Sequence, residues 1–169
     1  MAISMYSASV PVFTRMLGHL AAWLDKAEAH AQAKKFDTSV YLAARLAPDM
    51  LPLPKQIQIA CDAAKFGVAR LAGVEAPKFE DNEASLAELR ERIRKTVEFV
   101  CSVPAAAIEG TEDKDITVPR RDGNVVLEGE FYLKHYVQPN FYFHVTTAYA
   151  LLRHNGVELG KADYLGALK

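Results

Sequence analysis

The sequence predicts an all-α protein, an antiparallel four-helix bundle with a small β-hairpin between its third and fourth helices. Two observations predict this fold class. Four long segments repeat apolar residues at helical spacing, each with a recognisable start or stop signal. Most of the joining segments are short, which makes consecutive helices antiparallel neighbours. Because 169 residues, of which 50% are hydrophobic, suffice for one core, we expect a single domain over residues 1–169.

The first helix is expected over residues 11–30, where apolar side chains recur along one side at intervals of three and four. Ser9 is its expected N-cap, and Pro11 suits the first turn of a helix. A shorter helical piece is expected over residues 39–46, and a proline-rich loop follows it.

The second helix is expected from Pro54 to Leu71, and it stops before Gly73. Its apolar surface is unusually wide, because Ile59, Ala63 and Phe66 extend the core-facing side around the helix. The polar residues are confined to one stripe: Lys55, Gln58, Asp62 and Lys65. A helix that is apolar over most of its circumference is covered on two sides. We therefore expect a homodimer in which part of this helix contacts the partner subunit.

The third helix begins at a capping box formed by Ser85 and Glu88. The spacing predicts favourable surface ion pairs between Glu88 and Arg92 and between Glu91 and Lys95. These charges indicate a solvated helix face with a stabilising role.

A β-hairpin is expected after the third helix, with arms at 116–118 and 125–127 joined by the turn signal Arg121-Asp122-Gly123-Asn124. Residues 131–137 predict one or two helical turns. Pro139 then marks the expected start of the fourth helix, and Gly156 its end.

The composition excludes several function classes. A formal net charge of −1 supplies no field for nucleic acid or for an anionic membrane. Cys61 and Cys101 lack the spacing of a metal or redox motif, so we expect two free, packed thiols. No segment approaches the roughly 20 apolar residues that span a bilayer. The sequence therefore predicts a soluble, cytoplasmic protein that binds neither nucleic acid nor membrane.

The fourth helix is rich in aromatic residues, and helical spacing turns His144 toward its apolar side. Asn140 and Thr147 flank His144 one turn away on the same side. Such a polar strip inside a bundle is where helical proteins place ligand and metal sites. The alternative is a neutral core histidine that is hydrogen-bonded to Asn140 or to a facing side chain.

His19 lies at the rim of the apolar side of the first helix, one turn from Trp23. If the first and fourth helices are neighbours, these two residues close a pocket over His144. Apolar walls with a few convergent polar groups are typical of small-molecule sites, so we expect ligand contacts from His144, His19, Asn140, Trp23 and Thr147. Alternatively, His19 is half-exposed and packs on the Trp23 ring.

Several segments of the chain carry a family resemblance: Arg45–Met50, Gln56–Lys65, Pro139–Tyr149, Leu152–Gly156 and Gly160–Gly166. They resemble an uncharacterised family of short, mostly bacterial proteins that is similar to the DinB-like four-helix bundles. The resemblance covers essentially the whole chain. It implies the bundle fold and frequent dimerisation, and it places the chain near a superfamily of metalloenzymes.

The DinB-like metal site takes one histidine from the second helix and two from the fourth, spaced four residues apart. The second helix here has no histidine, and Asn140 and Ala148 stand four residues to either side of His144. Only His144 corresponds to a ligand of that site. We therefore expect no bound metal and no other cofactor.

Two function classes follow. The first is a small-molecule-binding protein or divergent enzyme that uses the polar strip around His144. The second is a non-catalytic bundle that serves dimerisation or partner binding after losing the metal site. The residues indicate no nucleophile, phosphate loop or dinucleotide motif that would name a reaction.

Overall fold

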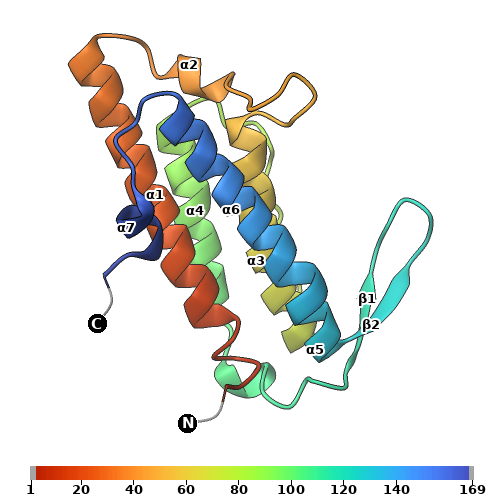
Figure 1. Ribbon diagram of the computed structural model, residues 1–169. Helices are drawn as coiled ribbons and strands as arrows, with labels where there is room; N and C mark the ends of the chain where they lie inside the picture. Colours follow the sequence, from red (N-terminus) through yellow and green to blue (C-terminus); the bar gives the residue numbers. More distant parts are fainter. Residues whose placement is uncertain (1–2, 168–169) are drawn as a thin grey trace.

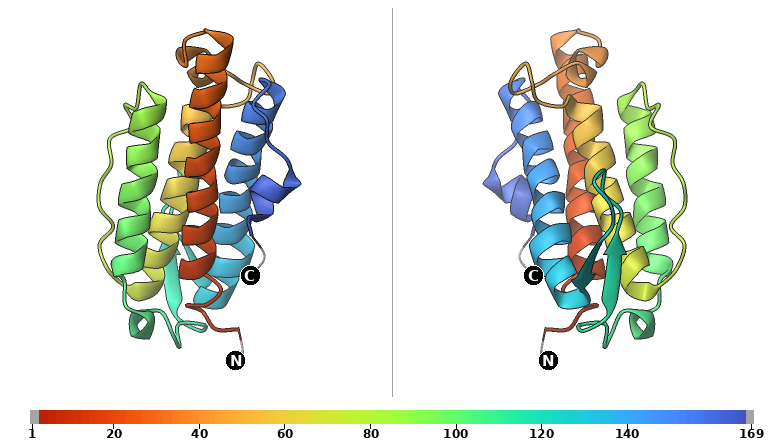
Figure 2. Two further views of the ribbon diagram at one scale, coloured as in Figure 1. Left: turned by 90° about the vertical axis from the view of Figure 1, so that its left-hand side faces the viewer. Right: turned by 90° about the vertical axis from the view of Figure 1, so that its right-hand side faces the viewer.

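The computed structural model describes residues 3–167 and confirms the predicted four-helix bundle. Its long helices are α1 (Val10–Lys34), α3 (Leu53–Ala72), α4 (Leu86–Ser102) and α6 (Gln138–His154), as Figure 1 shows. α1 and α3 each pack against both α4 and α6, so the core lies enclosed among all four helices. The two side views in Figure 2 show the helices standing nearly parallel to one axis.

α1 is longer than expected and ends at Lys35, which adopts the left-handed conformation with φ 58°. Ser9 stands at the N-cap position as expected, but its hydroxyl does not cap the helix and donates backward to the Met5 carbonyl at 2.6 Å. The short helix α2 (Ser39–Leu42) covers only the first half of the piece expected over residues 39–46.

Part of the polar stripe of α3 is covered, because Gln58 and Lys65 are buried. The segment between α3 and α4 folds back over it, and Arg92 of α4 is buried there with 3% of its surface exposed. Its guanidinium lies 3.1 Å from Asp62 and 2.9 Å from Glu83. The expected surface pair between Glu88 and Arg92 is therefore wrong. The expected helix start is confirmed, since the Ser85 hydroxyl accepts a hydrogen bond from the Glu88 N–H at 3.2 Å.

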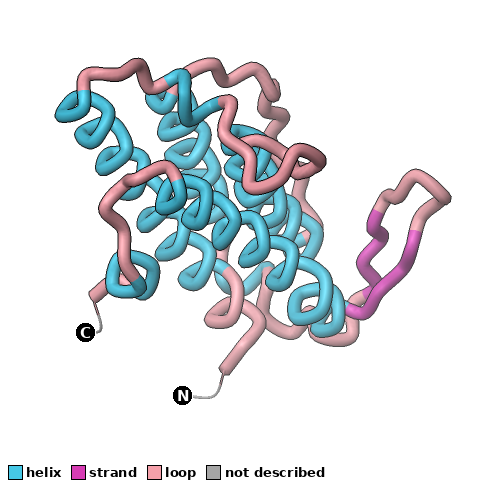
Figure 3. Tube along the Cα trace, turned by 45° about the horizontal axis from the view of Figure 1, so that its top comes forward, coloured by secondary structure: helices cyan, strands magenta, loops and turns pink. Residues whose placement is uncertain are grey.

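The predicted hairpin is confirmed. After a short 3₁₀ turn (η1, Ala105–Ala107), β1 (Asp115–Val118) pairs antiparallel with β2 (Val125–Glu128). Figure 3 shows the two strands projecting from the helical bundle, and β1 contacts α3. The hairpin thus stands beside the face of the bundle that α3 shares with α6.

The fourth long helix begins earlier than Pro139. α5 (Gly129–Phe131) and the π-helical turn η2 (Tyr132–Val137) run directly into α6. Pro139 has no N–H to donate to the preceding turn, and a widened π-turn accommodates that missing donor. At the other end, Gly156 has φ 90° and ends the helix as expected.

The cysteines differ from the prediction in one respect, because Cys61 is buried and free whereas Cys101 is free but exposed. The core is closed by aromatic contacts between helices, such as the rings of Phe13 and Phe141 at 4.9 Å. Within residues 3–167, no helix is long and apolar enough to cross a membrane.

Candidate ligand-binding site

His144 points inward, as predicted, with 8% of its surface exposed. Its Nδ1 lies 2.7 Å from Oε1 of Gln56 on α3. The Gln56 amide is oriented by its other end, because Nε2 donates to the Leu51 carbonyl at 2.9 Å. Nδ1 of His144 therefore carries the proton, and Nε2 holds a lone pair. Burial lowers the pKa of His144, which favours this neutral form.

His19 and Trp23 are engaged by the C-terminal segment, which contains α7 (Lys161–Leu165). Trp23 Nε1 donates to the Asp163 carbonyl at 3.2 Å, and His19 Nδ1 lies 3.0 Å from the Tyr164 carbonyl oxygen. The Tyr164 ring stacks on Trp23 with centroids 5.5 Å apart. The structure thus brings His19 and Trp23 together against α7, while the hydrogen bond of His144 goes to α3.

Asn140 and Thr147, the other two residues of the predicted polar strip, do not join His144 in one site. The Thr147 hydroxyl donates to the Phe143 carbonyl at 2.7 Å, within its own helix. Asn140, one turn before His144, instead lines a cavity on the outside of the bundle. Of the five predicted ligand contacts, Asn140 is the one that borders this cavity.

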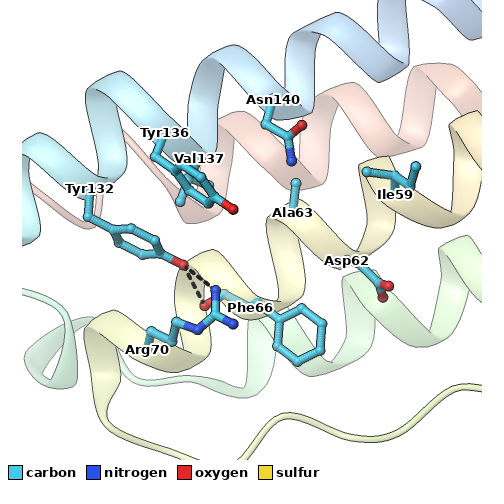
Figure 4. A pocket seen from close by; sticks show the side chains of 9 residues that line it. All are labelled: Ile59, Asp62, Ala63, Phe66, Arg70, Tyr132, Tyr136, Val137 and Asn140. Atoms are coloured by element: carbon cyan, nitrogen blue, oxygen red, sulfur yellow. Dashed lines mark hydrogen bonds between the residues drawn. The ribbon is translucent and has the colours of Figure 1, made fainter. Parts of the chain in front are cut away.

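The cavity, which we call the α3–α6 groove, has a volume of about 150 Å³ (Figure 4). It is lined from α3 by Ile59, Asp62, Ala63, Phe66 and Arg70, and from η2 and α6 by Tyr132, Tyr136, Val137 and Asn140. The apolar arc that widened the second predicted helix therefore forms one wall. That arc is half-buried within its own chain.

Polar groups converge on this apolar surface. In Figure 4 the Tyr136 hydroxyl and the Asn140 amide both point toward Ala63 in the middle of the groove. At one end, Nη1 of Arg70 donates to the Tyr132 hydroxyl at 3.1 Å, and that hydroxyl donates to the Phe66 carbonyl at 3.2 Å. Burial raises the pKa of Tyr132, so its hydroxyl keeps its proton at neutral pH.

A close helix contact sets the floor of the groove. A Cβ atom added at Gly67 would lie 2.6 Å from a methyl carbon of Val137. The missing side chain of Gly67 therefore lets η2 approach α3 closely. Because π-turns inside helices are often found at functional sites, the position of η2 beside the groove favours a functional role for the groove.

The groove and the His144 pair belong to one helix interface. α3 and α6 run antiparallel, so their residues meet in successive layers. Val137 meets Gly67 in one layer, and His144 meets Gln56 in a layer farther along, with Asn140 between them on α6. The predicted polar strip and the groove are thus neighbouring parts of the same contact.

Of the residues that line the groove, the sequence analysis assigned only Asn140 to a ligand site, and the polar ones that it did not single out at all are Arg70, Tyr132 and Tyr136. One signal pointed to Arg70, because it follows Phe66 by four residues and so continues the arc of Ile59, Ala63 and Phe66. No comparable signal existed for the tyrosines, since residues 131–137 were expected only as one or two helical turns ahead of a helix starting at Pro139.

The described residues do not fit a DinB-like metal site. Gln56, whose amide oxygen is a weak metal ligand, is the α3 residue that faces His144. Residues 3–167 contain no group of three or more His, Cys, Asp or Glu side chains that could hold a metal ion. The sequence-based expectation of a metal-free protein stays a prediction.

Fold and groove together define a four-helix bundle with a half-buried pocket on one helix interface. Comparison with known proteins gives its family. Residues 5–165 match the model of DUF1993, a domain of unknown function, and the chain belongs to that family. It is also similar to a solved structure, a DinB family member protein from Shewanella denitrificans, with 48% sequence identity and a TM-score of 0.91 over 96% of this chain and 92% of that one. No curated protein matches the chain significantly.

Proposed function

We propose that this protein binds a small molecule in the α3–α6 groove. The observation that carries the proposal is the combination of an apolar wall with polar groups that converge from two helices. Ile59, Ala63 and Phe66 supply the wall, and the Tyr136 hydroxyl and Asn140 amide face the middle of the groove. A concave apolar surface with a few oriented polar groups is the usual form of a ligand site.

We extend the proposal to His144, one turn beyond Asn140 on α6. The proton on Nδ1 is held by Gln56, which leaves Nε2 as a hydrogen-bond acceptor for a ligand that reaches this layer. His19, Trp23 and Thr147 stand outside the proposal, because α7 and the α6 backbone engage their polar atoms.

A blocking variant tests the groove. Ligand-observed NMR with a library of single-ring fragments should give hits for the wild type, and Ala63→Phe should abolish them by filling the middle of the groove. Ala33→Phe is the matched control, because Ala33 is an exposed helical alanine on α1. Hits that survive Ala63→Phe, or no hits for the wild type, would contradict the proposal.

A second candidate function is self-association through the same face. α6 leaves Phe143 exposed over 58% of its surface, and the loop before α3 leaves Leu51 exposed over 44%. Large exposed apolar side chains beside a half-buried apolar groove favour an interface with a second copy of the chain. Sedimentation equilibrium at micromolar concentration should then find a dimer that Phe143→Ser weakens. A monomer would argue against this function while leaving ligand binding intact.

A further inference from the structure

We propose that the ligand of the α3–α6 groove is a small organic anion, a single-ring carboxylic acid or a molecule of that size and charge, with Arg70 as its ion-pair partner. This inference rests on the proposed function and specifies the chemistry of the ligand. It follows from three features of the groove: an arginine without a counter-ion, the way that arginine is held, and the size of the space beside it.

Arg70 has no carboxylate partner among residues 3–167. The ion pairs within residues 3–167 are formed by lysines and by other arginines. Asp62 is the one carboxylate in the groove lining, and it is already occupied, because its Oδ1 lies 2.9 Å from Lys65 and 3.1 Å from Arg92. The groove therefore holds one half-buried positive charge that forms no ion pair with a carboxylate in the described part of the chain.

The Arg70 guanidinium is held in place. Nη1 donates to the Tyr132 hydroxyl, which is itself fixed by the Phe66 carbonyl, and Cζ lies 5.1 Å from the centre of the Phe66 ring. A guanidinium has five N–H donors, and within residues 3–167 the one hydrogen bond of Arg70 is that from Nη1, so this groove-lining residue keeps further donors for a ligand. A planar guanidinium held in one orientation matches the two oxygens of a carboxylate.

The volume fits a ligand with one ring. An apolar cavity of about 150 Å³ in an engineered protein binds benzene, and the groove has a similar volume. A carboxylate at Arg70 places the body of the ligand over Ala63, with the Phe66 and Tyr136 rings beside it and the Asn140 amide beyond (Figure 4). The apolar body and the charged end thus meet matching surfaces.

The hairpin adds positive charge next to the groove. Arg120 and Arg121 are exposed, and together with Pro119, Asp122 and Tyr136 they line a second cavity. Tyr136 borders both cavities, so these arginines stand at the neighbouring wall. Positive side chains near a cleft raise the local concentration of anions, and salt weakens this effect.

Phenylacetate and phenylacetamide test the inference, because they share one shape and differ in charge. Titrations followed by 1H–15N NMR should show phenylacetate binding about five- to tenfold more tightly than phenylacetamide, as expected for a charge-assisted contact at a half-exposed site. Arg70→Gln should remove that preference, so that the variant binds the two probes with equal affinity. Arg70→Lys should retain part of it, and Arg94→Gln, a change on the exposed face of α4, should retain all of it.

The outcomes separate the two proposals. Equal affinity of both probes for the wild type would overturn the anionic ligand and leave small-molecule binding standing. A preference that persists in Arg70→Gln would overturn the role of Arg70. Failure of both probes to bind would overturn the inference and count against the proposed function as well. The spectral dispersion of each variant reports directly on whether it is folded.

Discussion

Gly67→Ala is the sharpest test of how α3 and η2 form the floor of the groove. The new Cβ would stand 2.6 Å from a Val137 methyl carbon, and Val137 is buried with 2% of its surface exposed. Overpacking of this kind costs about 1–3 kcal/mol. The substitution also removes a glycine from a helix interior, which by itself gains about 0.5–1 kcal/mol. The measured change in the free energy of unfolding contains both contributions.

Gly18→Ala isolates the second contribution. Gly18 is an exposed glycine within α1, and a Cβ added there would meet nothing within 4 Å. Gly18→Ala should therefore stabilise the protein by about 0.5–1 kcal/mol. The Gly67→Ala variant should be less stable than the Gly18→Ala variant by about 1–3 kcal/mol.

Urea denaturation of the two variants measures that difference directly. A double variant, Gly67→Ala with Val137→Ala, should recover part of the loss, because the shortened side chain makes room for the new methyl group. Equal stabilisation by both single substitutions would refute the close contact between α3 and η2.

Three further predictions concern charge and metal. Arg92→Ala should lower the free energy of unfolding by about 3 kcal/mol, because partly buried carboxylates lose their partner. Arg94→Ala on the exposed face of α4 should lower it by less than about 1 kcal/mol. Equal losses for the two variants in urea denaturation would contradict the buried network. Lowering the pH from about 7 to 5 should destabilise the protein by up to about 1.4 kcal/mol per pH unit through His144, since the unfolded histidine gains a proton near pH 6.5 while burial lowers the pKa of the folded one. His144→Gln should lose that part of the slope, and an unchanged slope would show that His144 does not contribute. Elemental analysis should find no stoichiometric zinc or nickel, and one equivalent lost in His144→Ala would overturn the expectation of a metal-free protein.

Some features were predictable from the sequence because local rules determine them. Helical periodicity identified the four long helices, and Gly73 and Gly156 marked helix ends because their left-handed backbone favours glycine. The hairpin followed from its turn residues. The inward direction of His144 followed from its place on an amphipathic helix. Each of these signals lies within a few residues of the feature that it predicts.

The groove, in contrast, was decided by tertiary structure. Arg70 and Tyr132 are 62 residues apart in the chain, and only the packing of η2 against α3 brings them into contact. Periodicity shows which side of a helix is apolar but not which other helix covers it. For the same reason, the hydrogen-bond partner of His144 is Gln56 on α3, and that of His19 is the Tyr164 carbonyl on α7. Side-chain partners depend on the arrangement of the helices in space, and the arrangement is fixed only when the whole core packs.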